Sequence, residues 1–226
     1  MLINMRNGLM AGKRLPYDAE VEYLESTGTQ WIDTGVQGRD GLDFAYRAAF
    51  STVSTANGVG GEFDTVTTSS GKSFYLGIVR TNGYLSYHYD GTSAPIQVQQ
   101  VQANRVYDIT GHFYSGSQYM TVDGVRGGNG TIERAFTSSR TLYLFSINFT
   151  PPTPGMCRLY NFSLSSYGQV LRDMIPVRFT NELGQTEGAM YNRANPTVGM
   201  NHDGSARTDG LYRNRGTGAF GYGNDT

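Results

Sequence analysis

The residues best suited to binding chemistry lie in the run Tyr84–Asp90, where aromatic and polar side chains alternate. Alternate residues of an extended strand share a face. One face therefore carries Tyr84, Ser86, His88 and Asp90, and the other carries Leu85, Tyr87 and Tyr89. Aromatic rings stack on the C–H faces of sugars while nearby polar groups bind hydroxyls, so we predict ligand binding on the first face. In the alternative, Tyr87 and Tyr89 are core residues, and Tyr84 and His88 are ordinary surface residues.

Glu62 and Asp64 form the one carboxylate pair whose spacing suits cleavage of a glycosidic bond. Retaining glycosidases hold two carboxyl groups about 5.5 Å apart, roughly the distance between residues i and i+2 on one strand face. The alternative is two solvated carboxylates in a loop. The three histidines, His88, His112 and His202, lack the spacing of a metal site.

Calcium binding has two candidate segments, Asn201–Gly204 and Asp209–Gly210, which offer suitable oxygen ligands. Neither has the regular spacing of an EF-hand loop, and Asp-Gly pairs are common in turns. We therefore expect no cofactor and keep calcium as the alternative. Cys157 is the only cysteine, which excludes an intrachain disulfide and a cysteine-based zinc site.

The composition predicts an all-β protein. The 226 residues include 30 glycines and 16 tyrosines, and only 16% are charged, which is unlike a helical bundle or a disordered chain. The formal net charge of −1 argues against nucleic acid as a partner. There is no apolar run of about 18 residues, so we expect no membrane insertion.

Short alternating runs predict strands from residue 20 onward, and Asn82-Gly83 predicts a hairpin turn. The clearest expected strands are Leu42–Phe50, Phe74–Arg80, Tyr84–Tyr89, Val106–Tyr114, Gln118–Val122, Thr141–Asn148, Cys157–Leu164 and Val170–Val177. Pro151–Gly155 should be a loop, because proline cannot donate to a sheet ladder. Ten or more strands without helices indicate a two-sheet antiparallel sandwich. We expect one domain over residues 20–226, preceded by an N-terminal arm over residues 1–19.

Several segments resemble the concanavalin A-like (laminin-G-like) jelly-roll domains of gut-bacterial surface proteins and phage structural proteins. The similar segments are Glu22–Val36 (EYLESTGTQWIDTGV), Tyr119–Gly124 (YMTVDG), Arg158–Arg178, Glu187–Ala194 (EGAMYNRA) and Gly216–Gly221 (GTGAFG). They span nearly the whole predicted domain, while residues 195–215 depart from the pattern. Glucanases of this fold carry a third acid three residues after the aspartate, where this chain has Thr67. We therefore predict that the protein is not an enzyme.

The resemblance implies a virion-associated binding or structural protein of a phage, made in the host cytoplasm, with a host surface glycan and other virion proteins as partners. It also implies a homo-oligomer, with a trimer favoured. The alternatives are a capsid or tail decoration protein without a glycan ligand, and a bacterial surface carbohydrate-binding module or weak glycoside hydrolase. Decoration would use the N-terminal arm, whose apolar residues are Leu2, Ile3, Leu9 and Met10. The segment 1–12 lacks the continuous apolar stretch of a secretion signal, which favours the virion over the cell surface.

Overall fold

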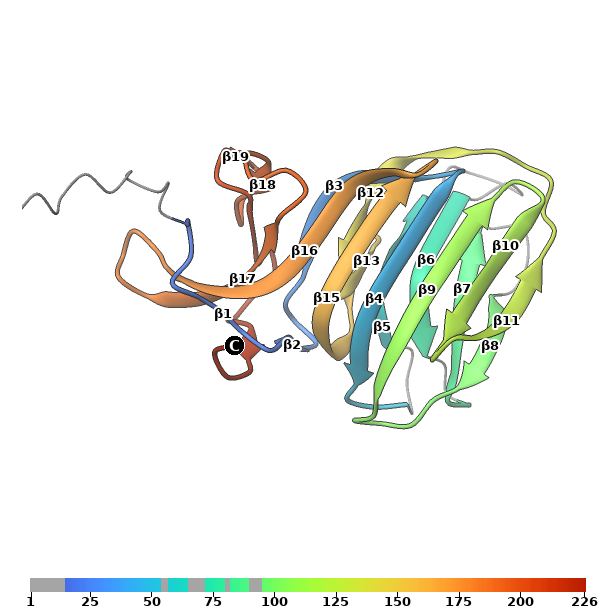
Figure 1. Cartoon of the computed structure of the whole chain (residues 1–226), viewed down its shortest axis with the longest axis horizontal. Coiled ribbons are helices and arrows are strands. Elements are labelled where there is room, and N and C mark those ends of the chain that lie inside the picture. Colours follow the sequence, from blue (N-terminus) through green and yellow to red (C-terminus); the bar gives the residue numbers. More distant parts are fainter. Residues whose placement is uncertain (1–14, 54–56, 65–71, 80–81, 90–94) are drawn as a thin grey trace, which may run out of the picture.

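The computed structural model describes residues 15–53, 57–64, 72–79, 82–89 and 95–226. These residues form strands and no helix, so no described helix is long and apolar enough to cross a membrane. Two sheets pack face to face as a concanavalin A-like jelly-roll sandwich, which confirms the predicted fold class (Figure 1).

The larger sheet has the strand order β11-β10-β9-β4-β15-β16-β17-β20-β18-β19, with β1, β2 and β21 attached at its side. Its strands are β1 (Ala19–Glu20), β2 (Leu24–Thr27), β4 (Leu42–Phe50), β9 (Val106–Tyr114), β10 (Ser117–Val122), β11 (Val125–Gly130), β15 (Met156–Ser166), β16 (Gln169–Thr180), β17 (Thr186–Asn192), β18 (Gly199–Met200), β19 (Ala206–Arg207), β20 (Leu211–Arg213) and β21 (Gly221–Tyr222). The outer face of β15, β4, β9 and β10 is turned toward the viewer in Figure 1.

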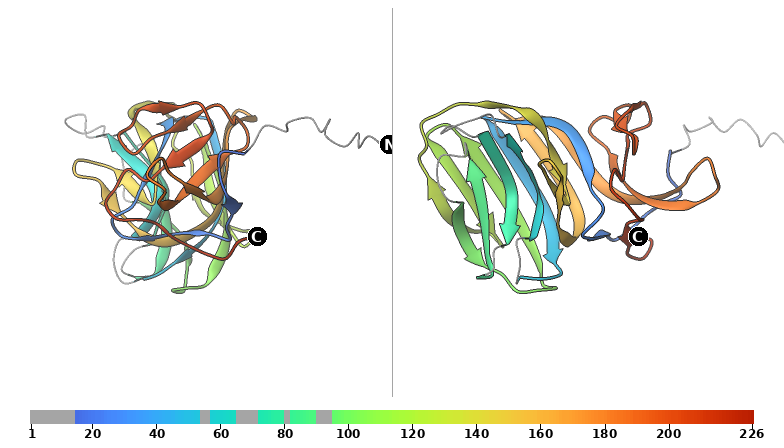
Figure 2. Two further views of the ribbon diagram at one scale, coloured as in Figure 1. Left: turned by 90° about the vertical axis from the view of Figure 1, so that its left-hand side faces the viewer. Right: turned by 180° about the vertical axis from the view of Figure 1, so that it is seen from behind.

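The smaller sheet lies behind it and has the order β14-β13-β5-β6-β7-β8, with β12 paired to β5 and β3 paired to β12. Its strands are β3 (Ile32–Arg39), β5 (Asn57–Asp64), β6 (Lys72–Val79), β7 (Tyr84–Tyr89), β8 (Ile96–Gln100), β12 (Thr137–Leu144), β13 (Ser146–Asn148) and β14 (Thr153–Pro154). Seen from behind in Figure 2, β6 and β7 lie in front.

The core between the sheets is built around Phe113 of β9, which is fully buried. Its ring centroid lies 4.9 Å from that of Phe74, 4.7 Å from Tyr87 and 5.2 Å from Phe44. Because Phe74 and Tyr87 belong to the opposite sheet, these contacts join the two layers. Buried aromatic side chains contribute most of the hydrophobic free energy in such a core.

A C-terminal lobe lies beside the sandwich, and we use that name for the outer half of β16 together with β17–β20 (Figure 1). It has its own apolar cluster: Ile175, Val177, Phe179, Ala189, Tyr191 and Leu211. β1 pairs with β16 here, and Tyr17 lies 5.0 Å from Tyr191. The C-terminal end is held by Asp225, which accepts hydrogen bonds from Arg178. The chain therefore enters and leaves the described structure on the same lobe.

Two local predictions are wrong. Thr141–Asn148 is not one strand, because Phe145 adopts a φ of 61° and separates β12 from β13. Pro151–Gly155 is not entirely loop, because Thr153 and Pro154 pair with Ile147 and Ser146. A two-residue strand at the end of a sheet tolerates a proline, since its outer side needs no donor.

Candidate functional site

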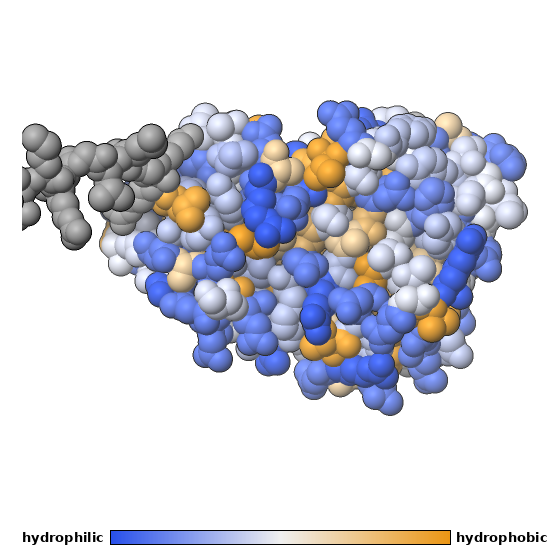
Figure 3. Space-filling model, viewed as in Figure 1, coloured by the Kyte–Doolittle hydropathy of each residue, from blue (hydrophilic) through white to orange (hydrophobic). Residues whose placement is uncertain are grey.

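The outer face of the large sheet gathers polar and aromatic side chains from three neighbouring strands. Residues of β9 alternate between the buried Tyr107, Ile109 and Phe113 and the outward Thr110, His112 and Tyr114. The strand register places His112 between Asp43 of β4 and Tyr119 of β10. Figure 3 shows this side of the molecule as mainly hydrophilic, with apolar side chains in small separate groups.

Asp43 anchors two of these side chains. Its Oδ1 atom lies 2.7 Å from His112 Nδ1, and its Oδ2 atom accepts a hydrogen bond of 2.6 Å from the Tyr114 hydroxyl. Burial raises the pKa of Tyr114 to about 12, and the hydrogen bond to the Asp43 carboxylate adds to this effect. Tyr114 therefore stays a neutral hydrogen-bond donor well above neutral pH.

Four rings form a continuous series across this face, which we call the aromatic row: Tyr119, His112, Tyr114 and Tyr167. The His112 centroid lies 4.1 Å from that of Tyr114 and 5.0 Å from that of Tyr119, and Tyr114 meets Tyr167 edge-on at 5.3 Å. The Arg126 guanidinium lies 3.7 Å from the Tyr119 ring centroid. Each ring is held by its neighbours, so the row is a fixed surface.

A groove of about 250 Å³ runs beside the aromatic row over β4, and we call it the β4 groove. His112 and Tyr119 form one wall, while Val170, which is 57% exposed, lies on the other. Ala45 leaves the floor open because its side chain is small. Polar groups surround this space: Asp43, Thr110, Ser163 and Ser165. Apolar walls with convergent polar groups are typical of sites that bind small polar ligands.

A wider cleft of about 790 Å³ lies at the other end of the aromatic row, and we call it the Arg39 cleft. Arg39, Arg134 and Tyr167 line it together with Asp40. The Asp40 carboxylate accepts hydrogen bonds from the hydroxyls of Tyr89 (2.6 Å) and Tyr167 (2.8 Å) and from the Ser115 amide (2.5 Å). Asp40 is therefore occupied by neutral donors.

The Tyr167 ring packs against Gly41. A Cβ atom at Gly41 would lie 2.2 Å from a ring carbon of Tyr167, and the φ of Gly41 is +76°, a value that favours glycine. Tyr167 is itself in a turn with Gly168, and its amide donates to the Gly41 carbonyl at 3.0 Å. Two turns therefore position the exposed end of the aromatic row.

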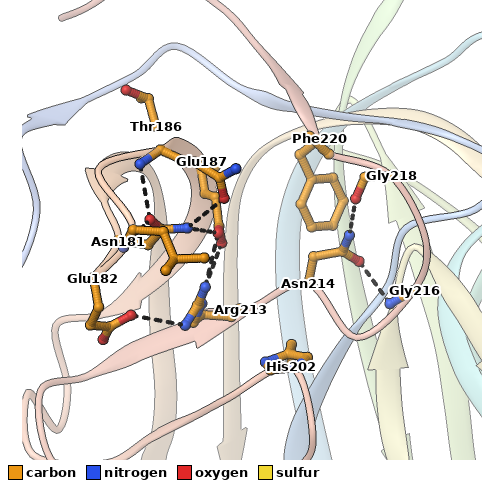
Figure 4. Close-up of a pocket in the computed structure, with 14 residues that line it drawn as sticks. Asn181, Glu182, Thr186, Glu187, His202, Arg213, Asn214, Gly216, Gly218 and Phe220 are labelled. Carbon is orange, nitrogen blue, oxygen red and sulfur yellow. Dashed lines mark hydrogen bonds and ion pairs between the residues drawn. The ribbon is translucent and has the colours of Figure 1, made fainter.

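A third cleft, of about 670 Å³, lies in the C-terminal lobe between the β16–β17 turn and residues 213–220 (Figure 4). Its central cation is Arg213, which donates to both carboxylate oxygens of Glu187 at 2.8 and 2.9 Å. Asn181 contacts the same carboxylate and closes the turn by accepting from the amides of Leu183 and Gln185. The charged groups there already satisfy one another, so this cleft is a weaker candidate.

The face predicted from Tyr84–Asp90 lies on the smaller sheet. Tyr84 is half-buried, Ser86 is fully buried and His88 is 6% exposed, while Asp90 lies outside the described residues. His88 Nδ1 is 2.5 Å from the Ser73 hydroxyl. Tyr87 and Tyr89 are core residues. A ligand-binding role for Tyr84, Ser86 and His88 stays a prediction.

The other candidates stand as follows. The backbones of Glu62 and Asp64 belong to β5, while their side chains lie outside the described part, as do Leu2, Ile3, Leu9 and Met10. Asp203 accepts hydrogen bonds from Ser205, and Asp209 pairs with Arg207. Within the described residues no three His, Cys, Asp or Glu side chains converge on a metal position. Calcium binding stays an untested alternative.

Sequence reasoning missed the aromatic row. His112 was recognisable as an outward residue, because buried Ile109, Gly111 and Phe113 alternate with it. Asp43 was recognisable in the same way on β4. The missing information was the register, which alone shows that Asp43, His112 and Tyr119 are cross-strand neighbours.

Comparisons with known proteins give distant structural likenesses. No protein-family model and no curated protein matches the sequence. Domains LG4-5 of the mouse laminin alpha1 chain are 14% identical with a TM-score of 0.46, covering 75% of this chain and 48% of that one. A pentraxin of Limulus polyphemus is 11% identical with a TM-score of 0.37, covering 68% and 72%. A Trypanosoma rangeli sialidase mutant displaying trans-sialidase activity is 14% identical with a TM-score of 0.44, covering 57% and 21%.

These comparisons correct one prediction. This chain is similar to about a fifth of the sialidase chain and to about half of the laminin fragment. Because a sialidase is among the similar structures, a jelly-roll fold does not exclude an enzyme, and the prediction of a non-enzymatic protein is wrong as a conclusion from fold. The predicted fold class, a two-sheet jelly-roll sandwich, is confirmed.

Proposed function

We propose that this protein binds a glycan in the β4 groove, with the sugar lying against the aromatic row. The observation that carries the proposal is that aromatic side chains and groups able to bind hydroxyls line the same groove. His112 and Tyr119 lie on one side and Val170 on the other. Asp43, Ser163 and Ser165 lie between them. A pyranose has an apolar C–H face and a rim of hydroxyls, so it matches both kinds of wall. Asp43 stays available as an acceptor because each of its oxygens has more than one lone pair.

The test is a glycan array, followed by affinity electrophoresis in gels that contain the polysaccharide that binds. Tyr119→Ala should weaken binding about two- to thirteenfold, since one aromatic contact contributes about 0.5–1.5 kcal/mol. Tyr222→Ala is the matched control, because Tyr222 is 40% exposed but lies on β21, away from the groove. Absence of binding to every glycan, or equal loss in both variants, would refute the proposal.

We further propose that the protein acts on the surface of a phage particle, or alternatively of a bacterial cell, as a binding or decoration module. The sequence resemblance supports this setting, and the arm supplies a means of attachment. Residues 18–20 already pair with β16, since the Asp18 amide donates to the Arg178 carbonyl at 2.9 Å. Deleting residues 1–14 alone therefore preserves the described contacts of the lobe.

The truncated protein should fold normally and fail to enter particles when it is expressed during infection. Unchanged incorporation would refute docking through the arm, while leaving glycan binding to be judged by the electrophoresis. Sedimentation of the full chain tests the proposed trimer, and a monomer at all concentrations would refute it.

A further inference from the structure

Arg39 differs from the other arginines that have buried guanidinium nitrogens. The Nε atoms of Arg39, Arg213 and Arg215 are all buried without a hydrogen-bond partner. Arg213 nevertheless pairs with Glu187 at 2.8 Å, and Arg215 pairs with Asp33 at 3.0 Å. Within the part of the chain that the structure describes, Arg39 has no carboxylate at ion-pair distance. A guanidinium that is half withdrawn from water without an anion is unfavourable, and a bound anion would relieve this.

Asp40 does not form an ion pair with Arg39. Asp40 follows it in the chain, but its carboxylate is directed to Tyr89, Tyr167 and the Ser115 amide. Arg134 also lines the Arg39 cleft. The open space of about 790 Å³ is large enough for a ligand group to enter.

The aromatic row extends from the β4 groove to the Arg39 cleft. His112 lines the groove, Tyr167 lines the cleft, and Tyr114 contacts both rings. A chain of sugars bound along the row would reach from the hydroxyl-binding groups to Arg39.

Resting on the proposed glycan site, we infer that the ligand is an acidic polysaccharide whose carboxylate or sulfate groups bind Arg39. The planar guanidinium pairs with either anion through two parallel hydrogen bonds. The uncharged part of the chain lies in the β4 groove. The ligand is therefore an anionic glycan, as opposed to a neutral one.

Affinity electrophoresis measures how strongly a polymer in the gel retards the full chain. Three gels are compared: one with polygalacturonate, one with the same polymer after reduction of its carboxyl groups, and one with dextran sulfate. Wild type should be retarded at least tenfold more strongly by polygalacturonate than by the reduced polymer, and added salt should weaken this preference. Stronger retardation by dextran sulfate would identify sulfate as the bound anion, and stronger retardation by polygalacturonate would identify carboxylate.

Arg39→Met keeps the aliphatic stem and should remove the preference for the acidic polymer, while binding to the reduced polymer stays unchanged and shows that the variant folds. Arg105→Met is the charge-matched control, because Arg105 is an exposed residue paired with Asp123. Equal binding of acidic and reduced polymers by wild type overturns the inference, and so does an equal loss in Arg39→Met and Arg105→Met. If Tyr119→Ala leaves binding to the reduced polymer unchanged, the groove proposal fails instead.

Discussion

Replacing Gly111 by alanine should destabilise the fold by about 1–2 kcal/mol, although Gly111 has no positive φ. Gly111 lies on β9 between Thr110 and His112, directly opposite Phe44. An added Cβ atom would lie 2.2, 2.4 and 2.8 Å from three carbons of the Phe44 ring. Ordinary van der Waals contact begins at 3.4 Å, so the ring would have to move by about 1 Å.

The Phe44 ring has little room for that movement. It is 3% exposed, and its centroid lies 5.2 Å from Phe113 and 5.8 Å from Tyr46. Overpacking of this kind costs about 1–3 kcal/mol. Alanine also restricts the unfolded chain, which returns about 0.4–1 kcal/mol, so the net loss is about 1–2 kcal/mol.

Urea unfolding followed by far-UV circular dichroism measures this loss. Phe44→Leu supplies the control background, because leucine lacks the ring carbons with which the new methyl group collides. There, Gly111→Ala should cost less than about 0.5 kcal/mol or should stabilise. Equal costs in the two backgrounds would show that the Phe44 ring is not the cause, and would refute the packing argument.

Three further predictions concern titration and the core. Asp43→Asn should lower the pKa of Tyr114 from about 12 toward 10, measured by phenolate absorbance with Tyr114→Phe as the reference. Burial disfavours the ionised form of Asp209, but hydrogen bonds to its carboxylate, the strongest from Arg207, outweigh burial and lower its pKa. The stability that ionised Asp209 contributes is therefore present at neutral pH and is lost as pH falls. Asp209→Asn should cost about 1 kcal/mol at pH 7 and flatten the acid limb of urea-melt stability; an unchanged limb would contradict this. Phe113→Ala should cost about 3–5 kcal/mol by the same melts, and a loss under 1 kcal/mol would contradict its central position.

The strands of this protein were predictable because most of them have one buried and one solvated face. Leu42–Phe50 and Val106–Tyr114 were predicted residue for residue, since their apolar residues recur at every second position. The break at Phe145 was not predictable, because apolar residues lie on both sides of that segment and hide the interruption. The C-terminal lobe was not predictable either, since β18 and β19 have only two residues each, too few to show an alternating pattern.

The candidate site was harder to predict than the fold, because single-strand patterns identify a face without identifying its neighbours. The run Tyr84–Asp90 has the richest mixture of aromatic and polar residues in one strand, yet Ser86 and His88 are buried. The aromatic row takes its four rings from β9, β10 and the turn after β15. No one of these segments is conspicuous in the sequence, and only the sheet register brings them together.

A four-residue segment, Asp40–Asp43, organises the whole face. Asp40 begins the turn after β3 and accepts a hydrogen bond from the hydroxyl of Tyr167, while Asp43 is the first outward residue of β4 and accepts one from that of Tyr114. Gly41 between them has no side chain and so leaves room for the Tyr167 ring. Asp40 fixes the Tyr167 ring through this hydrogen bond and forms no ion pair with Arg39. The same turn therefore builds the end of the aromatic row and leaves a cation beside it, which is the arrangement that an anionic glycan requires.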